Sequence, residues 1–142
     1  MTETQLQSEI AVSHSQKYPE QYGQLFHISN ERSNKTQAYI AKSIGIVPGV
    51  SDFIYISKKF NVATELKVSG KRHDVARISK QIKWGKVWEK QSKNNHWRMC
   101  FTTEQALSCY EGNFKGYTLK QAKKLIKNIK TQTIKIQWDE NF

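Results

Sequence analysis

Apolar residues recur at a spacing of three to four positions in several parts of the chain. Leu6 and Ile10 share one face of a first segment, in which Thr2 stands at the position of an N-cap. Gly45 stands where a second helix would end, and that helix would turn Ala38, Ala41 and Ile44 inward. The pattern predicts helices at residues 2–17, 35–44, 75–93, 103–110 and 119–130.

Shorter apolar stretches between these helices have the length and alternation of strands. They lie at residues 24–29, 52–56, 62–68, 96–101 and 133–138. Residues 57–61 read as a polar turn, and residues 69–74 as a basic loop around Gly70. Helices that alternate with strands predict an α/β fold, with a small mixed central sheet flanked by helices.

The predicted hairpin at residues 52–68 carries the candidate chemistry. Strand side chains alternate between faces, so Glu65 and Lys67 share a face while Leu66 points the other way. Asp52 enters the opposing strand. A hairpin closed by a turn at residues 57–61 would pair Asp52 with Leu66, on the wrong face. A catalytic role for all three therefore requires a one-residue bulge or a distorted strand start.

Two carboxylates beside a lysine suit metal-assisted phosphodiester hydrolysis. Asp52 and Glu65 are hard oxygen ligands of the kind that Mg²⁺ or Mn²⁺ prefers, and the backbone carbonyl of Leu66 is a candidate third ligand. Such a metal polarises a phosphate and activates a bound water. Lys67 is placed to orient that water or to stabilise charge on the phosphorane. A Glu-x-Lys pair alone is common on exposed strands, so the prediction depends on Asp52 as well.

The net charge of the chain indicates a polyanionic partner. The 142 residues carry 23 Lys and Arg against 12 Asp and Glu, a formal net charge of +11. Such a balance favours DNA, RNA or an acidic membrane. Lys71, Arg72 and Arg77 follow the candidate catalytic strand, where they either grip phosphates or form a solvated loop. A second basic face lies on the predicted helix at residues 119–130: Lys120, Lys123, Lys124 and Lys127.

Several motifs together resemble one nuclease family. They are Phe-His-Ile-Ser-Asn at residues 26–30, Gly-Ile-Val-Pro-Gly-Val-Ser-Asp-Phe at 45–53, Glu-Leu-Lys at 65–67, Ser-Lys-Gln-Ile-Lys-Trp at 79–84, and Trp-Arg-Met-Cys-Phe at 97–101 before a short helix. In this order the chain resembles the virus-type replication-repair nucleases (VRR-Nuc) of the PD-(D/E)xK superfamily, over about residues 3–111. Ser29 and Ser51 stand where that family often has proline.

The resemblance implies a restriction-endonuclease-like domain at residues 1–111. Residues 112–142 lie outside the resemblance, and we expect them to form a basic extension packed on the same domain. It implies that Asp52 and Glu65 bind metal, that Lys67 is catalytic and that Gln81 helps to hold the active site. Glu3 best matches the acid of the family's N-terminal helix, with Glu9 as its competitor. The implied activity is that of a Mg²⁺- or Mn²⁺-dependent DNA endonuclease acting on branched, junction or flap DNA, in a homodimer.

Two alternatives stay open: a binding module that has lost catalysis, and an RNA-directed nuclease. A reader of RNA on a sheet surface would show an aromatic-rich strand motif, which the sequence lacks. Cys100 and Cys109 are expected to be reduced, and four scattered histidines do not suggest zinc. Without a signal peptide or a membrane span, the expected location is the cytoplasm, or that of a host cell if the protein is viral.

Overall fold

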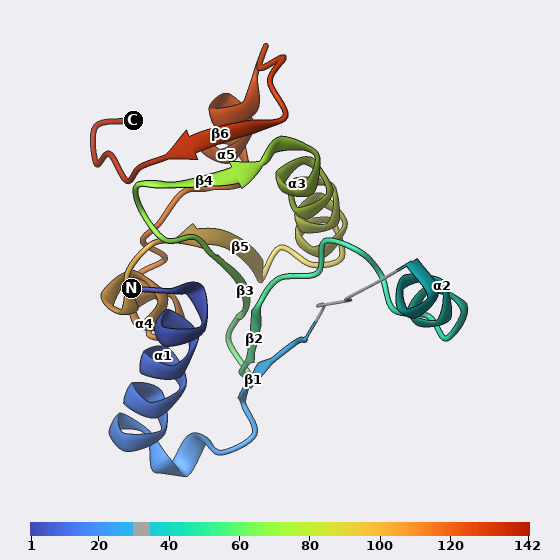
Figure 1. Cartoon of the computed structure of the whole chain (residues 1–142). Helices are drawn as coiled ribbons and strands as arrows, with labels where there is room; N and C mark the ends of the chain where they lie inside the picture. The colour runs from blue at the N-terminus through green and yellow to red at the C-terminus, as the bar shows by residue number, and fades with distance from the viewer. Residues whose placement is uncertain (30–34) are drawn as a thin grey trace.

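A mixed four-stranded sheet forms the centre of the part of the chain that the computed structural model describes, residues 1–29 and 35–142 (Figure 1). Its strands stand in the order β1 (Leu25–His27), β2 (Phe53–Ile56), β3 (Asn61–Leu66) and β5 (Asn95–Cys100). The pairs β1–β2 and β2–β3 are antiparallel, whereas β3–β5 is parallel. The predicted α/β fold with a small mixed sheet is confirmed. Asn30, the last residue of the first motif, lies outside the described residues.

Helices cover both faces of this sheet. On one face, α1 (Glu3–Lys17) and α4 (Thr103–Tyr110) bury apolar side chains against Phe53, Val62 and Leu66. On the other, α3 (Val75–Lys90) and α5 (Leu119–Ile126) pack over Ile54 and Ala63. The alternation of β2 and β3 therefore separates two cores. Glu65 follows the alternation of Ala63 and therefore lies on the face that α3 covers.

The C-terminal residues pack on the rest of the chain. Tyr117 is buried and forms a bridge with Met99 at the end of β5, and Ala122 of α5 is fully buried. The strand β6 (Thr133–Ile136) pairs with β4 (Lys71–Asp74) in a separate two-stranded antiparallel sheet. The prediction of a loop at residues 69–74 is thus wrong for its last four residues. Because β4 pairs with β6, which lies far along the chain, the local sequence does not indicate that residues 71–74 form a strand.

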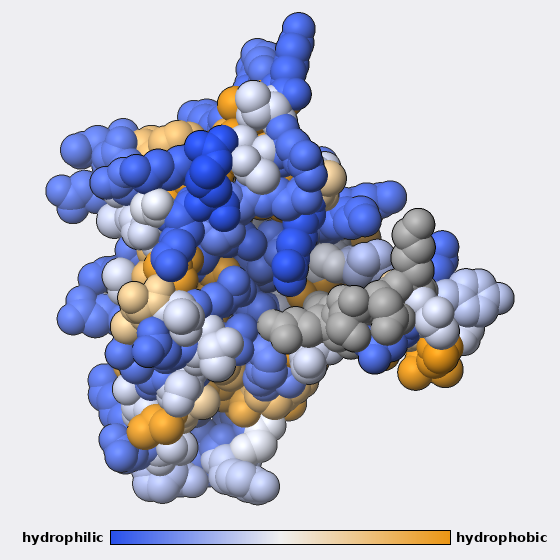
Figure 2. Space-filling model, viewed as in Figure 1, coloured by the Kyte–Doolittle hydropathy of each residue, from blue (hydrophilic) through white to orange (hydrophobic). Residues whose placement is uncertain are grey.

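The helix α2 (Lys35–Ser43) differs most from its prediction. Ala41 is buried, but Ala38 is exposed and Ile44 is 70% exposed, so only one of the three residues expected to face inward does so. Gly45 ends the helix with a φ of +90°, as predicted. Figure 1 shows α2 standing away from the sheet, and Figure 2 shows hydrophobic side chains at that edge of the molecule.

Other elements agree in type with the predictions and differ at their ends. A short 3₁₀-helix at Pro19–Gln21 was not predicted. The helix α5 ends at Ile126 rather than at residue 130, because Lys127 is extended and Asn128 has a φ of 62°. Cys100 and Cys109 are free and both lie in the core. No helix among the described residues has the length and apolar character needed to span a membrane.

Candidate active site

The turn between β2 and β3 decides which residues meet across the hairpin. Ile56 pairs with Asn61 and Phe53 with Thr64, so continuing the ladder by one step sets Asp52 opposite Glu65. The expected turn at residues 57–61 would have set Asp52 opposite Leu66. The structure therefore removes the mismatch with a turn shorter by one residue, and the predicted bulge or distortion is not needed.

The side chain of Ser57 closes this shorter turn. Its hydroxyl accepts a hydrogen bond from the Phe60 amide at 3.1 Å and donates one to the Phe60 carbonyl at 2.5 Å. The Ser57 amide donates to Oδ1 of Asn61 at 3.3 Å. These local bonds satisfy turn backbone groups and let Asn61 join the strand. As a result, Asp52, Glu65 and Lys67 all lie on the face that α3 covers.

Short contacts hold the three residues in place. Oδ2 of Asp52 accepts a hydrogen bond of 2.8 Å from the backbone amide of Leu66, which ties the start of β2 to the end of β3. Nζ of Lys67 lies 3.3 Å from Oε1 of Glu65. Both charged residues of that pair are buried, with Glu65 2% and Lys67 3% exposed. Charges are rarely buried to this extent unless they are paired or bind a metal.

Negative charge exceeds positive charge at this centre. Burial is the main cause that raises the pKa of Asp52 to about 6; the Glu3 carboxylate raises it further, while the Leu66 amide and Lys67 act against the rise. Burial, and then the charge of Asp52, raise the pKa of Glu65 well above its ordinary value. Oε2 of Glu65 is buried without a hydrogen-bond partner among the described residues. The site thus holds one buried carboxylate oxygen, Oε2 of Glu65, that the described residues do not satisfy.

The two candidate acids of α1 occupy different environments. Oε2 of Glu9 accepts a hydrogen bond of 2.9 Å from Oγ1 of Thr103, at the start of α4. Glu3 lies at the N-terminus of α1, and its charge raises the pKa of both Asp52 and Glu65. Of the two, the structure brings Glu3 to the candidate site and commits Glu9 to a contact with α4.

Gln81 reaches the same face of the sheet from α3. Its side chain is buried and its Oε1 has no hydrogen-bond partner among the described residues. The turn before Asp52 presses against α3 at this point: a Cβ on Gly49 would lie 2.4 Å from the carbonyl oxygen of Lys80 and 3.0 Å from the Gln81 nitrogen. Gly49 also has a φ of +85°, which favours glycine. The Pro-Gly turn therefore fixes the spacing between α3 and the strand start that carries Asp52.

The three basic residues predicted to grip phosphates are not equivalent. The guanidinium of Arg72 donates two hydrogen bonds of 3.0 Å to Thr133, so it links β4 to β6. Lys71 and Arg77 are exposed. Burial, followed by the charges of Lys67 and Arg77, lowers the pKa of His73, which indicates that these two cations lie near one imidazole. Of the three basic residues, Arg77 is therefore the one that shares a neighbour, His73, with Lys67 of the candidate site.

His27, which the sequence allows either to face the site or to be an ordinary sheet histidine, lies beside the backbone of Asp52. Nδ1 of His27 donates a hydrogen bond of 2.8 Å to the backbone carbonyl of Asp52, and the His27 ring tilts against Phe53. Its charge lowers the pKa of Asp52. The β1–β2 register pairs His27 with Phe53, so its side chain lies on the Phe53 face of the sheet and its bond reaches only the backbone of Asp52.

The chemistry of the donor set fits one hard divalent cation. Three carboxylates, Asp52, Glu65 and Glu3, and the single ammonium of Lys67 leave two formal negative charges when all are ionised. The Leu66 backbone lies next to Asp52 and is the candidate source of a carbonyl ligand. Within the described part of the chain, no three His, Cys, Asp or Glu side chains gather closely enough to hold a metal by themselves. A metal here would need backbone and water ligands besides Asp52 and Glu65, as Mg²⁺ commonly has.

Comparison with known proteins adds no further assignment: no family model matches the chain, and no curated protein or solved structure is significantly similar to it.

Proposed function

We propose that this protein is a metal-dependent nuclease with a restriction-endonuclease-like fold, of the PD-(D/E)xK type and resembling the VRR-Nuc family. The observation that carries the proposal is the register of the hairpin. It sets Asp52 opposite Glu65 and leaves Lys67 on the same buried face. A hairpin shifted by one residue would have separated Asp52 from the other two.

Each residue has a distinct role in the proposed reaction. Asp52 and Glu65 hold Mg²⁺ or Mn²⁺, together with the carbonyl of Leu66, and Glu3 adds negative charge nearby. The metal, when bound, polarises the scissile phosphate and lowers the pKa of a water molecule. Lys67 is held at the site by its 3.3 Å contact with Glu65, and its ammonium would orient the attacking water or stabilise the negative charge on the phosphorane oxygens.

The raised pKa values favour a carboxylate pair that binds metal over one that only stabilises the fold. A structural Glu–Lys pair would be neutral as a unit, whereas Asp52 adds a charge that its burial and the nearby charge of Glu3 make unfavourable. A divalent cation would relieve that repulsion. Gln81, with its unpartnered buried oxygen, would orient a ligand or a water molecule in the loaded site.

DNA is the proposed substrate. The net charge of +11 suits a phosphate backbone, and the resemblance points to branched forms such as junctions and flaps. An RNA-directed nuclease and a binding module without catalysis are the other outcomes to distinguish. The test is incubation of the purified chain with labelled junction, flap, duplex and single-stranded DNA, and with RNA of the same sequence, each with and without Mn²⁺.

Cleavage of branched DNA in Mn²⁺, lost in Asp52→Ala and Lys67→Ala proteins that still bind DNA, is the expected result. Preferential cutting of the RNA would mean that the substrate is RNA rather than DNA. Tight binding without cutting of any substrate in Mn²⁺ or Mg²⁺ would mean that the chain is a binding module. Glu104→Ala, at an exposed position on α4, is the matched control for loss of one carboxylate.

A further inference from the structure

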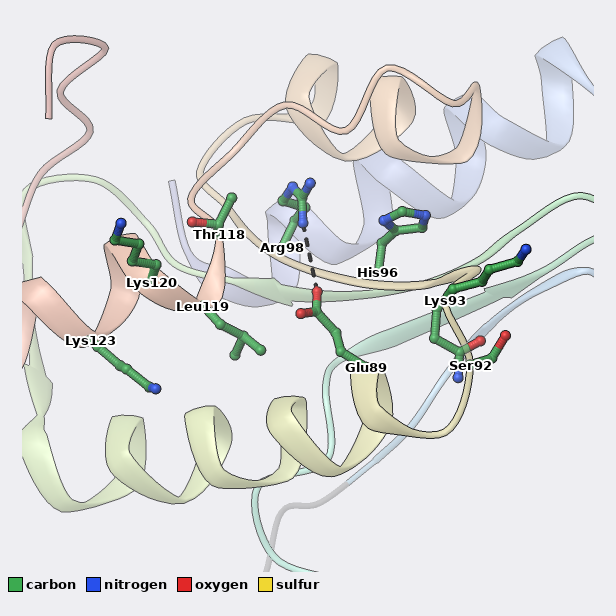
Figure 3. A pocket seen from close by; sticks show the side chains of 10 residues that line it. Glu89, Ser92, Lys93, His96, Arg98, Thr118, Leu119, Lys120 and Lys123 are labelled. Carbon is green, nitrogen blue, oxygen red and sulfur yellow. Dashed lines mark ion pairs between the residues drawn. The ribbon is translucent and has the colours of Figure 1, made fainter.

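A basic groove lies between α3 and α5, apart from the residues of the candidate active site. It consists of two adjoining hollows of about 670 and 610 Å³. Lys120 and Lys123 of α5 line both of them. Figure 3 shows the smaller hollow, with these two lysines on one side and Glu89, near the end of α3, on the other.

The packing of α5 on α3 gives the groove its shape. Gly85 of α3 is buried, and a Cβ there would lie 2.7 Å from Cδ2 of Leu119 and 2.8 Å from Cδ1 of Trp97. The two helices therefore approach closely at Gly85. Ala122 is fully buried, whereas the lysines of α5 remain exposed. The apolar side of α5 is thus used for packing, and its lysines border the hollows on either side of the contact.

The charge of the groove is almost entirely positive. No acidic residue is among the described residues that line the larger hollow, but six lysines are: Lys83, Lys86, Lys120, Lys123, Lys124 and Lys127. The smaller hollow has one carboxylate, Glu89, whose Oε2 lies 3.8 Å from a guanidinium nitrogen of Arg98 and accepts a hydrogen bond from the Trp97 amide. The acid that could neutralise the lysines is thus engaged elsewhere.

Two of the lysines face each other across the helix pair. Contact with the Lys86 side chain is the main cause that lowers the pKa of Lys123. Like charges brought together without a carboxylate destabilise the free protein and favour a bound anion. Two helices that each bring an ammonium to the same point provide the geometry that a phosphate group needs.

We propose that the groove between α3 and α5 is a second nucleic-acid site, which holds the phosphodiester backbone of DNA away from the Asp52–Glu65 centre. From Ser79 to Glu89 the groove follows α3 for about 15 Å at 1.5 Å per residue. One strand of a duplex presents about four phosphates over that length. The groove thus has the length and the charge to hold one arm of a branched substrate.

DNA binding in the groove does not depend on cleavage. The test therefore uses the Glu65→Gln protein in EDTA and measures binding alone. The variant Lys86→Gln/Lys123→Gln is compared with Lys58→Gln/Lys59→Gln, which removes the same charge from an exposed turn. Affinity for labelled duplex DNA is measured by fluorescence anisotropy between about 50 and 200 mM salt. Thermal melting of each protein checks that it is folded.

The groove variant is expected to lose about two units from the slope of log K against log salt, at about 0.9 per phosphate contact, while the control keeps its slope. A second pair, Lys120→Gln/Lys127→Gln, is expected to give a similar loss. Equal slopes in all variants would overturn the proposal. So would binding to phosphatidylserine vesicles that exceeds binding to DNA and depends on the same lysines, because the groove would then be a membrane contact. Failure of cleavage by the wild-type protein would leave these results unaffected.

Discussion

Replacing Asp52 with asparagine should stabilise the protein while removing its response to metal. Asparagine has nearly the same shape, and its side-chain oxygen can still accept the 2.8 Å hydrogen bond from the Leu66 amide. What it removes is a negative charge in a site where burial and Glu3 disfavour that charge. The substitution also removes the Asp52 charge that raises the pKa of Glu65.

The size of the effect follows from the pKa of Asp52. Its rise from 3.8 to about 6 is close to two units, and each unit corresponds to about 1.4 kcal/mol. Because Asp52 is partly exposed, solvent reduces the cost, and we expect Asp52→Asn to raise the free energy of unfolding by about 1 to 3 kcal/mol at pH 8.

The pH dependence has a definite sign. Below pH 3.8, Asp52 is protonated in both the folded and the unfolded protein, so its charge costs nothing. The contribution of Asp52 to the stability of the wild type falls as the pH rises from 3.8 through about 6, because the folded state then loses a proton that it holds more tightly. The advantage of the variant should therefore grow over this range and stay constant above it.

The assay is urea unfolding at pH 5 and pH 8, in EDTA and in Mg²⁺. At a Mg²⁺ concentration about 100 times the dissociation constant, the wild type should gain about 2.7 kcal/mol and Asp52→Asn much less. Glu140→Gln, at an exposed position near the C-terminus, is the control for loss of an acidic charge. An Asp52→Asn protein less stable than the wild type in EDTA at pH 8, or stabilised equally by Mg²⁺, would refute the reasoning.

Three further substitutions test other parts of the structure. Gly49→Ala should lower the melting temperature and reduce cleavage together, because its methyl group meets the Lys80 carbonyl; a normal melting temperature would contradict the packing of this turn. Tyr110→Phe should cost about 1 to 2 kcal/mol in urea unfolding, since it leaves the buried hydroxyl of Thr64 without its 2.7 Å partner, and an unchanged midpoint would refute this. If α2 forms the interface of a homodimer, Ile44→Asp should yield a monomer in analytical ultracentrifugation at concentrations where the wild type is a dimer, and a monomeric wild type would exclude that role.

Elements with local signals could be predicted from the sequence. The Thr2 hydroxyl accepts a hydrogen bond from the Gln5 amide, which confirms the predicted cap of α1. The bounds predicted for α4 agree with Thr103–Tyr110, where Thr102 caps the helix. The two strands of the hairpin and the candidate residues on them could also be predicted, because alternation and a polar turn are both local features of the sequence.

The positions of the residues in the site depend on contacts that cannot be predicted from the local sequence. The hairpin register depends on how the Ser57 side chain closes its turn, and a change of one residue moves Asp52 to the other face. The position of His27 depends on the pairing of β1 with β2. Periodicity failed for α2, where Ile44 has helical spacing with Ala41 but remains exposed. Amphipathic spacing shows which residues can share a face, but it does not show what covers that face.

The most direct test of the proposed function is the initial rate of cutting of one labelled branched DNA by the wild type and by Glu65→Gln, measured side by side in Mn²⁺, Ca²⁺ and EDTA. We predict cutting by the wild type in Mn²⁺, little cutting in Ca²⁺ and none in EDTA, because Ca²⁺ prefers a looser coordination. Glu65→Gln, which keeps the shape of the buried side chain, should cut at least about 100-fold more slowly while binding the DNA, as expected for loss of one electrostatic contact in the transition state. Cutting by Glu65→Gln at the wild-type rate, or undiminished cutting by the wild type in excess EDTA, would contradict the assignment of the Asp52–Glu65 centre.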